Sequence, residues 1–169
     1  MNRSIRDAIE HSISALTEAG VPFEALAEYE PARRRLFFAA RARFRPLGQV
    51  WRLGVLLLSA DGTVHSVGTT TRAIAPRHPN NQSLSAETRR HFRETAFRGP
   101  FTAGQIVNFD THPVDWTPAG LRNQDSSVWE ADGRILVRWR PGADATNSIP
   151  FTDYLNEKVA LATANTSTA

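Results

Sequence analysis

Apolar and basic residues alternate strictly from residue 40 to residue 45, where the sequence reads Ala-Arg-Ala-Arg-Phe-Arg. This pattern is typical of a strand with one buried face and one solvent face, because successive side chains point to opposite sides. Pro46-Leu47-Gly48 interrupts it. The run Val55–Leu58 then follows, too apolar for a surface element, and it predicts a central strand covered on both faces.

Two Asp-Gly pairs, Asp61-Gly62 and Asp132-Gly133, predict tight hairpin turns. Asp and Gly tolerate the positive φ angles that such turns require, and both pairs lie between segments rich in β-favouring residues. The segments expected to pair antiparallel are 50–58 with 63–72, and 126–131 with 134–140. Within 134–140, alternation predicts that Ile135, Val137 and Trp139 face inward and that the arginines face outward.

Apolar positions at helical spacing predict three clear helices and one uncertain one. The first lies between Ser4 and Gly20, with its inward stripe at Ile5, Ile9, Ile13 and Leu16. The second runs from residue 84 to 98 after a Ser83 or Ser85 N-cap, with Leu84, Thr88, Phe92 and Ala96 inward. The third covers 149–162, with Phe151, Tyr154, Leu155, Val159 and Ala162 inward. Residues 23–35 predict a short helix that Pro31 interrupts.

Residues 100–126 are punctuated by proline and glycine, and 106–109 is their only strand-like run. The order of elements predicts an α+β fold with a single antiparallel sheet of about five strands, formed by the meander and the hairpin. Three to four helices would pack on this sheet. We expect one domain over residues 1–164 and a frayed tail over 165–169.

Composition excludes several classes of site. The 169 residues include no cysteine, so disulfides, thiolate metal ligands, iron–sulfur clusters and cysteine nucleophiles are ruled out. No apolar stretch approaches the roughly 18 residues of a membrane span, and the first residues lack the apolar core of a secretory signal. We therefore expect a cytoplasmic protein without membrane association. The sequence does not indicate an oligomeric state.

The modest net charge of +3 hides a strong asymmetry along the chain. Residues 33–93 hold twelve arginines and two carboxylates, a formal charge of +10, whereas the remainder carries −7. One interpretation is a face that binds an anion such as phosphate, an acidic partner or nucleic acid. The alternative, which we favour at this stage, is a solvated face whose arginines pair with carboxylates of the same fold. Lys158 is the only lysine, which indicates codon usage more than selection for phosphate.

Arginine stands beside tryptophan at Trp51-Arg52 and at Arg138-Trp139-Arg140. Such pairs could stack a base or an anionic ring. Strand alternation favours buried tryptophans with outward arginine neighbours instead. Nucleic acid is therefore the less favoured partner.

Three segments carry a resemblance to a known family. They read Val-Trp-Arg-Leu-Gly-Val-Leu-Leu-Leu at 50–58, Arg-Trp-Arg-Pro-Gly-Ala at 138–143 and Pro-Phe-Thr-Asp-Tyr-Leu at 150–155. Together they resemble a family of short, uncharacterised bacterial proteins, and the likeness covers most of residues 30–160. Some members carry the label glutaminase. The residues do not support that label, because Lys158 lacks the serine of a Ser-x-x-Lys motif and no cysteine is present.

Catalytic motifs are sparse. No two histidines have the spacing of a metal site, and neither a phosphate-binding glycine loop nor a Gly-x-Ser-x-Gly elbow occurs. Asp110-Thr111-His112 with Asp115 comes closest to a metal-ligand group, but we expect neither a metal nor a cofactor.

The best candidate site lies where a loop at 77–83, which precedes a helix N-terminus, meets the segment 108–116. Both are polar and stiffened by proline, and a helix N-terminus attracts anions. The candidate ligand-binding residues are Arg77, His78, Asn80, Asn81, Asp110 and His112. We expect a small-ligand or anion-binding module, or an interaction module, whose ligand is a small anion. A hydrolase of amidohydrolase type that uses the histidines and aspartate of these loops is the alternative, and a nucleic-acid-binding sheet face is third.

Overall fold

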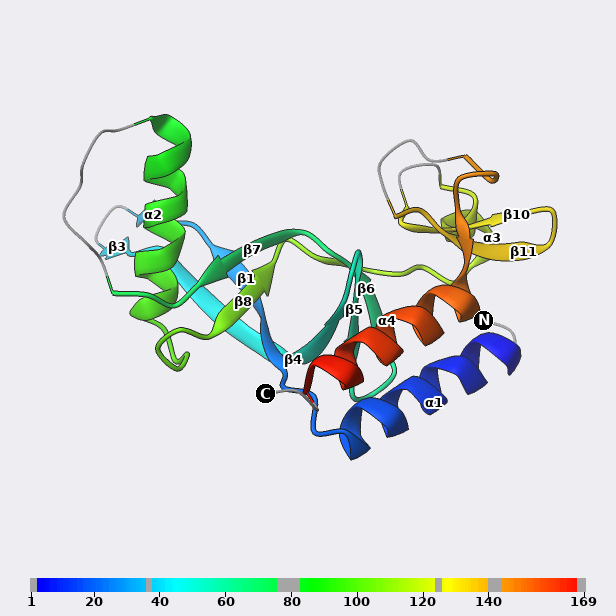
Figure 1. The fold of residues 1–169 in the computed structure, drawn as a ribbon. Helices are drawn as coiled ribbons and strands as arrows, with labels where there is room; N and C mark the ends of the chain where they lie inside the picture. Colours follow the sequence, from blue (N-terminus) through cyan, green and yellow to red (C-terminus); the bar gives the residue numbers. More distant parts are fainter. Residues whose placement is uncertain (1–2, 36–37, 76–82, 124–125, 140–143, 167–169) are drawn as a thin grey trace. The chain divides into compact units, whose positions relative to one another are not determined.

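The computed structural model describes residues 3–35, 38–75, 83–123, 126–139 and 144–166. They form the α+β fold expected from the sequence (Figure 1). The helices are α1 (Arg3–Glu18), α2 (Leu84–Phe97), α3 (Pro118–Leu121) and α4 (Phe151–Thr166). The strands are β1 (Glu24–Glu30), β2 (Arg33–Arg35), β3 (Phe38–Ala40), β4 (Arg43–Leu53), β5 (Leu56–Ser59), β6 (Val64–Ser66), β7 (Thr69–Arg72), β8 (Ile106–Phe109), β9 (His112–Pro113), β10 (Val128–Ala131), β11 (Arg134–Val137) and β12 (Ile149–Pro150). No helix in the described ranges is long and apolar enough to cross a bilayer.

The strands form three sheets, so the expectation of a single sheet of about five strands is wrong. The largest has seven strands in the order β7-β8-β1-β4-β5-β6-β9, and β1 and β8 pair in parallel within it. A second sheet has the order β10-β11-β12, and β2 pairs with β3 in a third. The hairpin predicted over 126–140 forms as β10 and β11, and it pairs with β12 rather than with the meander. The largest sheet gains strands from segments where the sequence predicted a helix or a loop.

Contacts along the chain group into two compact units. Unit 1 comprises residues 1–23, 50–67 and 112–169, and unit 2 comprises 24–49 and 68–111. The boundary falls inside β4, whose first residues belong to unit 2 and whose last residues belong to unit 1.

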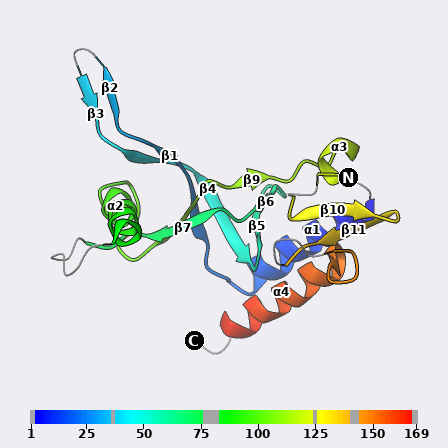
Figure 2. The ribbon, with the colours of Figure 1, turned by 90° about the horizontal axis from the view of Figure 1, so that it is seen from above.

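Unit 1 is built around α1 and α4, which lie side by side (Figures 1 and 2). The predicted stripes of both helices are buried, except that Ile13 and Ala162 are half-buried. They pack with Trp51, Leu56 and Leu58 in one core. Gly20 ends α1 with φ +65, and the amides of Gly20 and Val21 close the helix by bonding the carbonyls of Thr17 and Leu16. This is the glycine C-cap that the sequence predicted.

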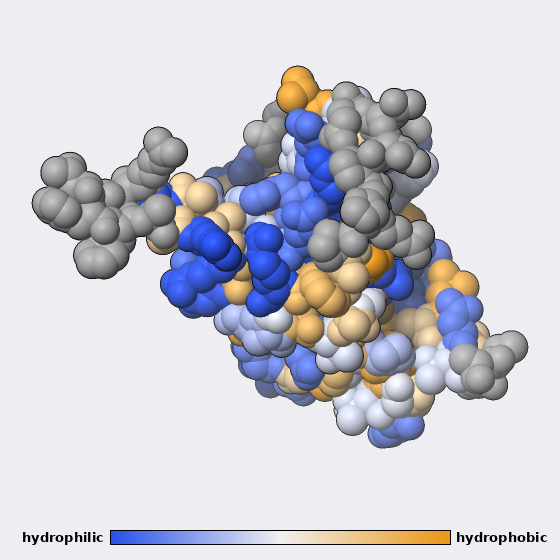
Figure 3. Space-filling view, turned by 90° about the vertical axis from the view of Figure 1, so that its left-hand side faces the viewer, coloured by the Kyte–Doolittle hydropathy of each residue, from blue (hydrophilic) through white to orange (hydrophobic). Residues whose placement is uncertain are grey.

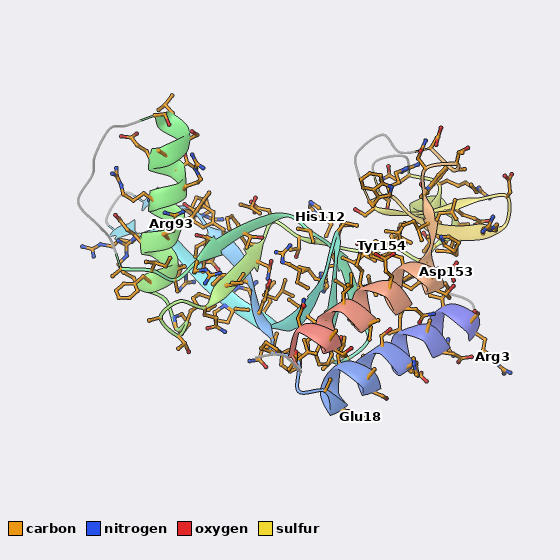
Figure 4. The ribbon with its side chains drawn as sticks, in the orientation of Figure 1. Arg3, Glu18, Arg93, His112, Asp153 and Tyr154 are labelled. Atoms are coloured by element: carbon orange, nitrogen blue, oxygen red, sulfur yellow. The ribbon has the colours of Figure 1, made fainter. Side chains whose placement is uncertain are left out.

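The apolar stretch 51–58 is a hairpin rather than one strand. Leu53 faces Leu56 across a two-residue turn at Gly54-Val55, and Gly54 has φ +64. A glycine in this first position is what a type II′ turn requires. The Tyr154 hydroxyl fastens the turn, because it accepts the amide of Val55 at 2.8 Å and donates to the Leu53 carbonyl at 3.1 Å (Figure 4). A Cβ at position 54 would collide with the same hydroxyl.

The predicted core strand is confirmed for Leu56, Leu57 and Leu58, which are almost fully buried in β5 between β4 and β6, whereas Val55 lies in the turn before it. Asp61-Gly62 does join β5 to β6, but through a three-residue loop in which only Gly62 has a positive φ. The predicted strand 63–72 divides into β6 and β7. The break falls at residues 67 and 68, and the backbone of Asp110 approaches Gly68 too closely for any side chain there.

The second hairpin matches the prediction closely. Val128 pairs with Val137 and Ala131 with Arg134, and Asp132 and Gly133 both have positive φ angles of 51 and 70. The expected inward position of Trp139 is wrong, because this side chain is 49% exposed and its Nε1 bonds the backbone of Asn147. Alternation fails there because β11 ends at Val137.

Unit 2 packs α2 against strands through a cluster of aromatic rings. Residues 24–30 form β1, so the helix predicted over 23–35 is wrong. Ala25, Leu26 and Ala27 are all buried, and a strand covered on both faces loses the alternation that would reveal it. Tyr29, Phe44, Phe92 and Phe109 meet with ring centroids 4.8 to 6.3 Å apart.

Helix α2 begins at the Ser83 N-cap, as predicted, because the Ser83 side chain accepts the amide of Ala86. Its inward face is shifted from the expected one. Thr95 and Ala96 are buried and Phe92 is half-buried, but Leu84 is 85% exposed and Thr88 is exposed. The buried face of α2 is therefore limited to the C-terminal part of the helix.

Candidate functional site

Four of the six candidate ligand-binding residues, Arg77, His78, Asn80 and Asn81, lie outside the described residues. The shared site predicted for the loops 77–83 and 108–116 therefore stays a prediction, and so does the hydrolase that would use it. Ser83, which ends the first loop, acts as a helix cap.

The other two candidates, Asp110 and His112, are both exposed and belong to different units. Asp110 follows β8 with φ 53. The pKa of Tyr29 is raised mainly by burial of its hydroxyl and further by the negative charge of Asp110. His112, labelled in Figure 4, begins β9 and faces Ser66.

The polar groups around these two candidates have structural roles. Asn108 is fully buried in β8, and its amide bonds Glu24 and the Ala25 carbonyl. Asp115 accepts the amide of Thr117 at the start of α3, and this bond lowers the pKa of its carboxyl. Among the described residues, no group of three or more histidines and carboxylates converges as a metal site would require.

The tryptophan–arginine pairs divide between core and surface. Trp51 is buried, stacks on Phe23 at 4.2 Å and donates to the Val21 carbonyl, which confirms its predicted core position. The guanidinium of Arg138 lies 4.0 Å from the ring of Trp129, a tryptophan that the sequence did not pair with it. This arginine also donates to the Ser126 carbonyl, so it fastens its own hairpin.

A cluster of arginines and glutamates lies on a two-stranded ribbon. One side of this ribbon is formed by β1 and β2, and the other by β3 and β4 (Figure 2). Arg33 faces Ala40 where β2 pairs with β3. Glu30 lies three residues before Arg33, and Arg43 lies three residues after Ala40. The side chains of Glu30 and Arg43 form an ion pair at 2.7 Å. Equal steps on the two sides are what antiparallel strands give, and β1 and β4 are neighbours in the largest sheet.

The two faces of this ribbon differ sharply. Ala42 and Phe44 are buried, and Phe44 contacts Tyr29 in the aromatic cluster under α2. Arg41, Arg43 and Arg45 alternate with them and are exposed. The alternation predicted for residues 40–45 is confirmed from Arg41 to Arg45, and it directs three guanidinium groups to one face. Ala40 is exposed instead of buried, and Pro46-Leu47-Gly48 does not end the strand, because β4 runs from Arg43 to Leu53.

These arginines line a recess of about 550 Å³, which we call the arginine recess. Its charged residues are Glu28, Glu30, Arg33, Arg41, Arg43 and Arg45. Strongly hydrophilic side chains gather in this region, beside the grey segment at the left of Figure 3. Four guanidinium groups face two carboxylates, so the lining has a surplus of positive charge.

Cross-strand ion pairs organise the recess. Arg43 binds Glu30 at 2.7 Å, and Arg45 binds both Glu28 and Glu30. The hydrogen bond from Arg43 is the main cause that lowers the pKa of Glu30, and the charges of Arg43, Arg45 and Arg33 act in the same direction. Glu30 therefore stays ionised. The predicted pairing of arginines with carboxylates of the same fold is confirmed for Arg43 and Arg45.

The charge asymmetry of the sequence follows the division into units. Unit 2 contains twelve arginines and six carboxylates, a formal charge of +6, and unit 1 carries −3. The arginine recess thus belongs to the basic unit. Sequence reasoning found its residues as an alternating strand but missed the site, because β1, which supplies the two glutamates, was predicted as a helix.

No family model, curated protein or solved structure matches this chain. The resemblance to a family with glutaminase-labelled members therefore stays a prediction.

Proposed function

We propose that unit 2 is an anion-binding module and that the arginine recess is its binding site. The observation that carries this proposal is the excess of guanidinium over carboxylate groups in one exposed recess. Guanidinium groups bind phosphate and sulfate oxygens through paired, charge-assisted hydrogen bonds, which makes arginine well suited to oxyanions.

The rigidity of the ribbon supports the same proposal. Phe44 and Ala42 are buried on the opposite face, and this burial restrains the backbone that carries the arginines. A fixed array loses less conformational entropy when a ligand binds than arginines on a loop would. The proposal moves the anion site predicted from the sequence away from the 77–83 loop to β1 and β4.

Elution from a heparin column tests the proposal with a generic anionic surface. The triple variant Arg41→Ala, Arg43→Ala, Arg45→Ala should elute at clearly lower salt than the wild type. The matched control is Arg3→Ala, Arg122→Ala, Arg134→Ala, which removes the same charge from exposed positions of unit 1. It should elute close to the wild type. Equal losses in the two triple variants would mean that net charge alone controls retention, and the recess would lose its role.

A further inference from the structure

The arginine recess has a shape that distinguishes among anions. Arg41, Arg43 and Arg45 occupy alternate positions of one extended segment and face the same side. Alternate residues of an extended chain lie about 7 Å apart, so the backbone positions that carry the three arginines span about 14 Å. A row of this length exceeds a single phosphate group and matches a linear polymer of anions.

We propose that the partner of this row is double-stranded nucleic acid, bound through the phosphates of its backbone. This inference rests on the proposed anion-binding function of unit 2. A nucleic-acid strand presents one phosphate for about every 3.4 Å of helix axis, which gives each arginine of the row a phosphate within reach. The major groove of B-form DNA, about 12 Å wide, admits a two-stranded β-ribbon, so this ribbon can lie along the groove with its arginines directed to the phosphates that border it.

The face that carries the row argues against single strands. Proteins that bind single strands combine a basic groove with aromatic side chains on which the bases stack. The aromatic residues Tyr29 and Phe44 of this ribbon instead point to the opposite face, into the cluster under α2. The charged side chains described on the arginine face are guanidinium groups and carboxylates, and guanidinium groups contact the phosphates of a duplex without unstacking its bases.

The same features predict weak sequence preference and a choice of duplex. Contacts to phosphates position a protein but do not read bases. A-form RNA has a deep and narrow major groove that a ribbon does not enter, so B-form DNA is the expected duplex. The sequence alone made nucleic acid the less favoured partner. The recess that these arginines share with Glu28 and Glu30, which the sequence did not reveal, reverses that preference.

The two glutamates act as internal competitors for the same arginines. Arg43 and Arg45 are bound to Glu28 and Glu30 in the free protein, and a phosphate must share or replace these contacts. The double variant Glu28→Gln, Glu30→Gln removes the competing charges and keeps similar side-chain shapes. It should bind DNA several-fold more tightly than Glu10→Gln, Glu18→Gln, which makes the same charge change on exposed positions of α1.

Fluorescence anisotropy with a DNA duplex of roughly two helical turns, about 20 base pairs, tests the inference. Affinity should be similar for unrelated sequences and should fall steeply with salt. For each phosphate contact the logarithmic salt slope changes by about 0.9, so the recess triple variant should lose about 2 to 3 from this slope. The unit 1 triple variant should keep it. Circular dichroism and urea melts of each variant confirm that the fold is retained.

Two further measurements distinguish the nucleic-acid inference from the proposed anion binding. Equal or tighter binding of the same length of single-stranded DNA, or of an RNA duplex, would overturn the choice of B-form duplex. Heparin retention that depends on the recess, together with duplex binding that does not, would overturn the nucleic-acid inference and leave anion binding in place. Loss of both dependences would overturn both proposals.

Discussion

The two units of this chain reach stability by different means. Unit 1 buries a large aliphatic and aromatic core between α1, α4 and the strands β4–β6, and its formal charge is −3. Unit 2 has a smaller core of alanines and aromatic rings, and its formal charge is +6. Apolar burial supplies the main driving force of folding, whereas an excess of like charges opposes the compact state.

This difference bears on the proposed function. Screened surface ion pairs contribute little stability, so the arginines of the unit with the smaller core add little to folding. Binding of an anion, as proposed for unit 2, would give them a role. The comparison therefore favours the arginine recess over sites in unit 1, and substitutions in the two units test it.

The largest effect is expected in the core of unit 1. Leu56→Ala should lower the free energy of unfolding by about 2–5 kcal/mol, because it removes a fully buried side chain and leaves a cavity. Urea denaturation followed by circular dichroism measures this loss. A cost below about 1 kcal/mol would mean that β5 is not the central packed strand and that the core of unit 1 lies elsewhere.

The turn between β4 and β5 gives the second comparison. Tyr154→Phe should cost about 1–3 kcal/mol, because the Val55 amide and the Leu53 carbonyl lose their shared partner within the structure. In unit 2, Tyr29→Phe removes an exposed hydrogen bond to His91 at 2.9 Å, where water can replace the hydroxyl, and should cost less. Urea melts of the two variants in parallel measure these costs. A larger loss of stability in Tyr29→Phe than in Tyr154→Phe would contradict the stabilisation of the turn by Tyr154.

Periodicity predicted the elements that have one buried side. The stripes of α1 and α4 and the alternation at 40–45 each place apolar side chains on a single face, so spacing reveals them. Turn chemistry likewise predicted the hairpin at 128–137, because Asp132 and Gly133 adopt the positive φ angles that such a turn demands.

Periodicity failed where a segment is buried on both sides or where a turn is hidden in an apolar run. Ala25-Leu26-Ala27 in β1 shows no alternation, and Gly54 was read as part of a strand although it forms a turn. The site was missed for a related reason. The arginines of β4 were visible in the sequence, but their partners Glu28 and Glu30 become neighbours only once 24–30 is a strand.

A third, smaller effect concerns the ion pairs of the recess. Arg43→Ala should change the free energy of unfolding by no more than the uncertainty of a urea melt, because the side chain is 70% exposed and its pair is screened by solvent. The same variant should weaken retention on heparin. A loss of stability comparable to that of Leu56→Ala would show that the arginines hold the ribbon together, and it would remove the argument that they are kept for binding.

The smallest effect is expected from His65, a half-buried residue of β6 in unit 1. Its Nδ1 is buried and has no hydrogen-bond partner within the described part of the chain. Burial of the ring lowers the pKa of His65 below its ordinary value of 6.5, although the charge of Asp61 opposes the shift. The folded state therefore resists protonation, whereas the unfolded chain takes up a proton near the ordinary pKa.

The sign of the resulting pH dependence follows from this difference. The contribution of His65 to stability is complete above the ordinary pKa and is lost as the pH falls below it, because the unfolded state then binds more protons. Urea midpoints at about pH 7.5 and about pH 5.5, which bracket that pKa, should therefore differ less in His65→Gln than in the wild type. His11→Gln, at an exposed position of α1, is the matched control and should keep the wild-type difference. If the difference between the two urea midpoints stayed the same in His65→Gln, burial of this ring would not affect its protonation. The ring would then be accessible to water in the folded state.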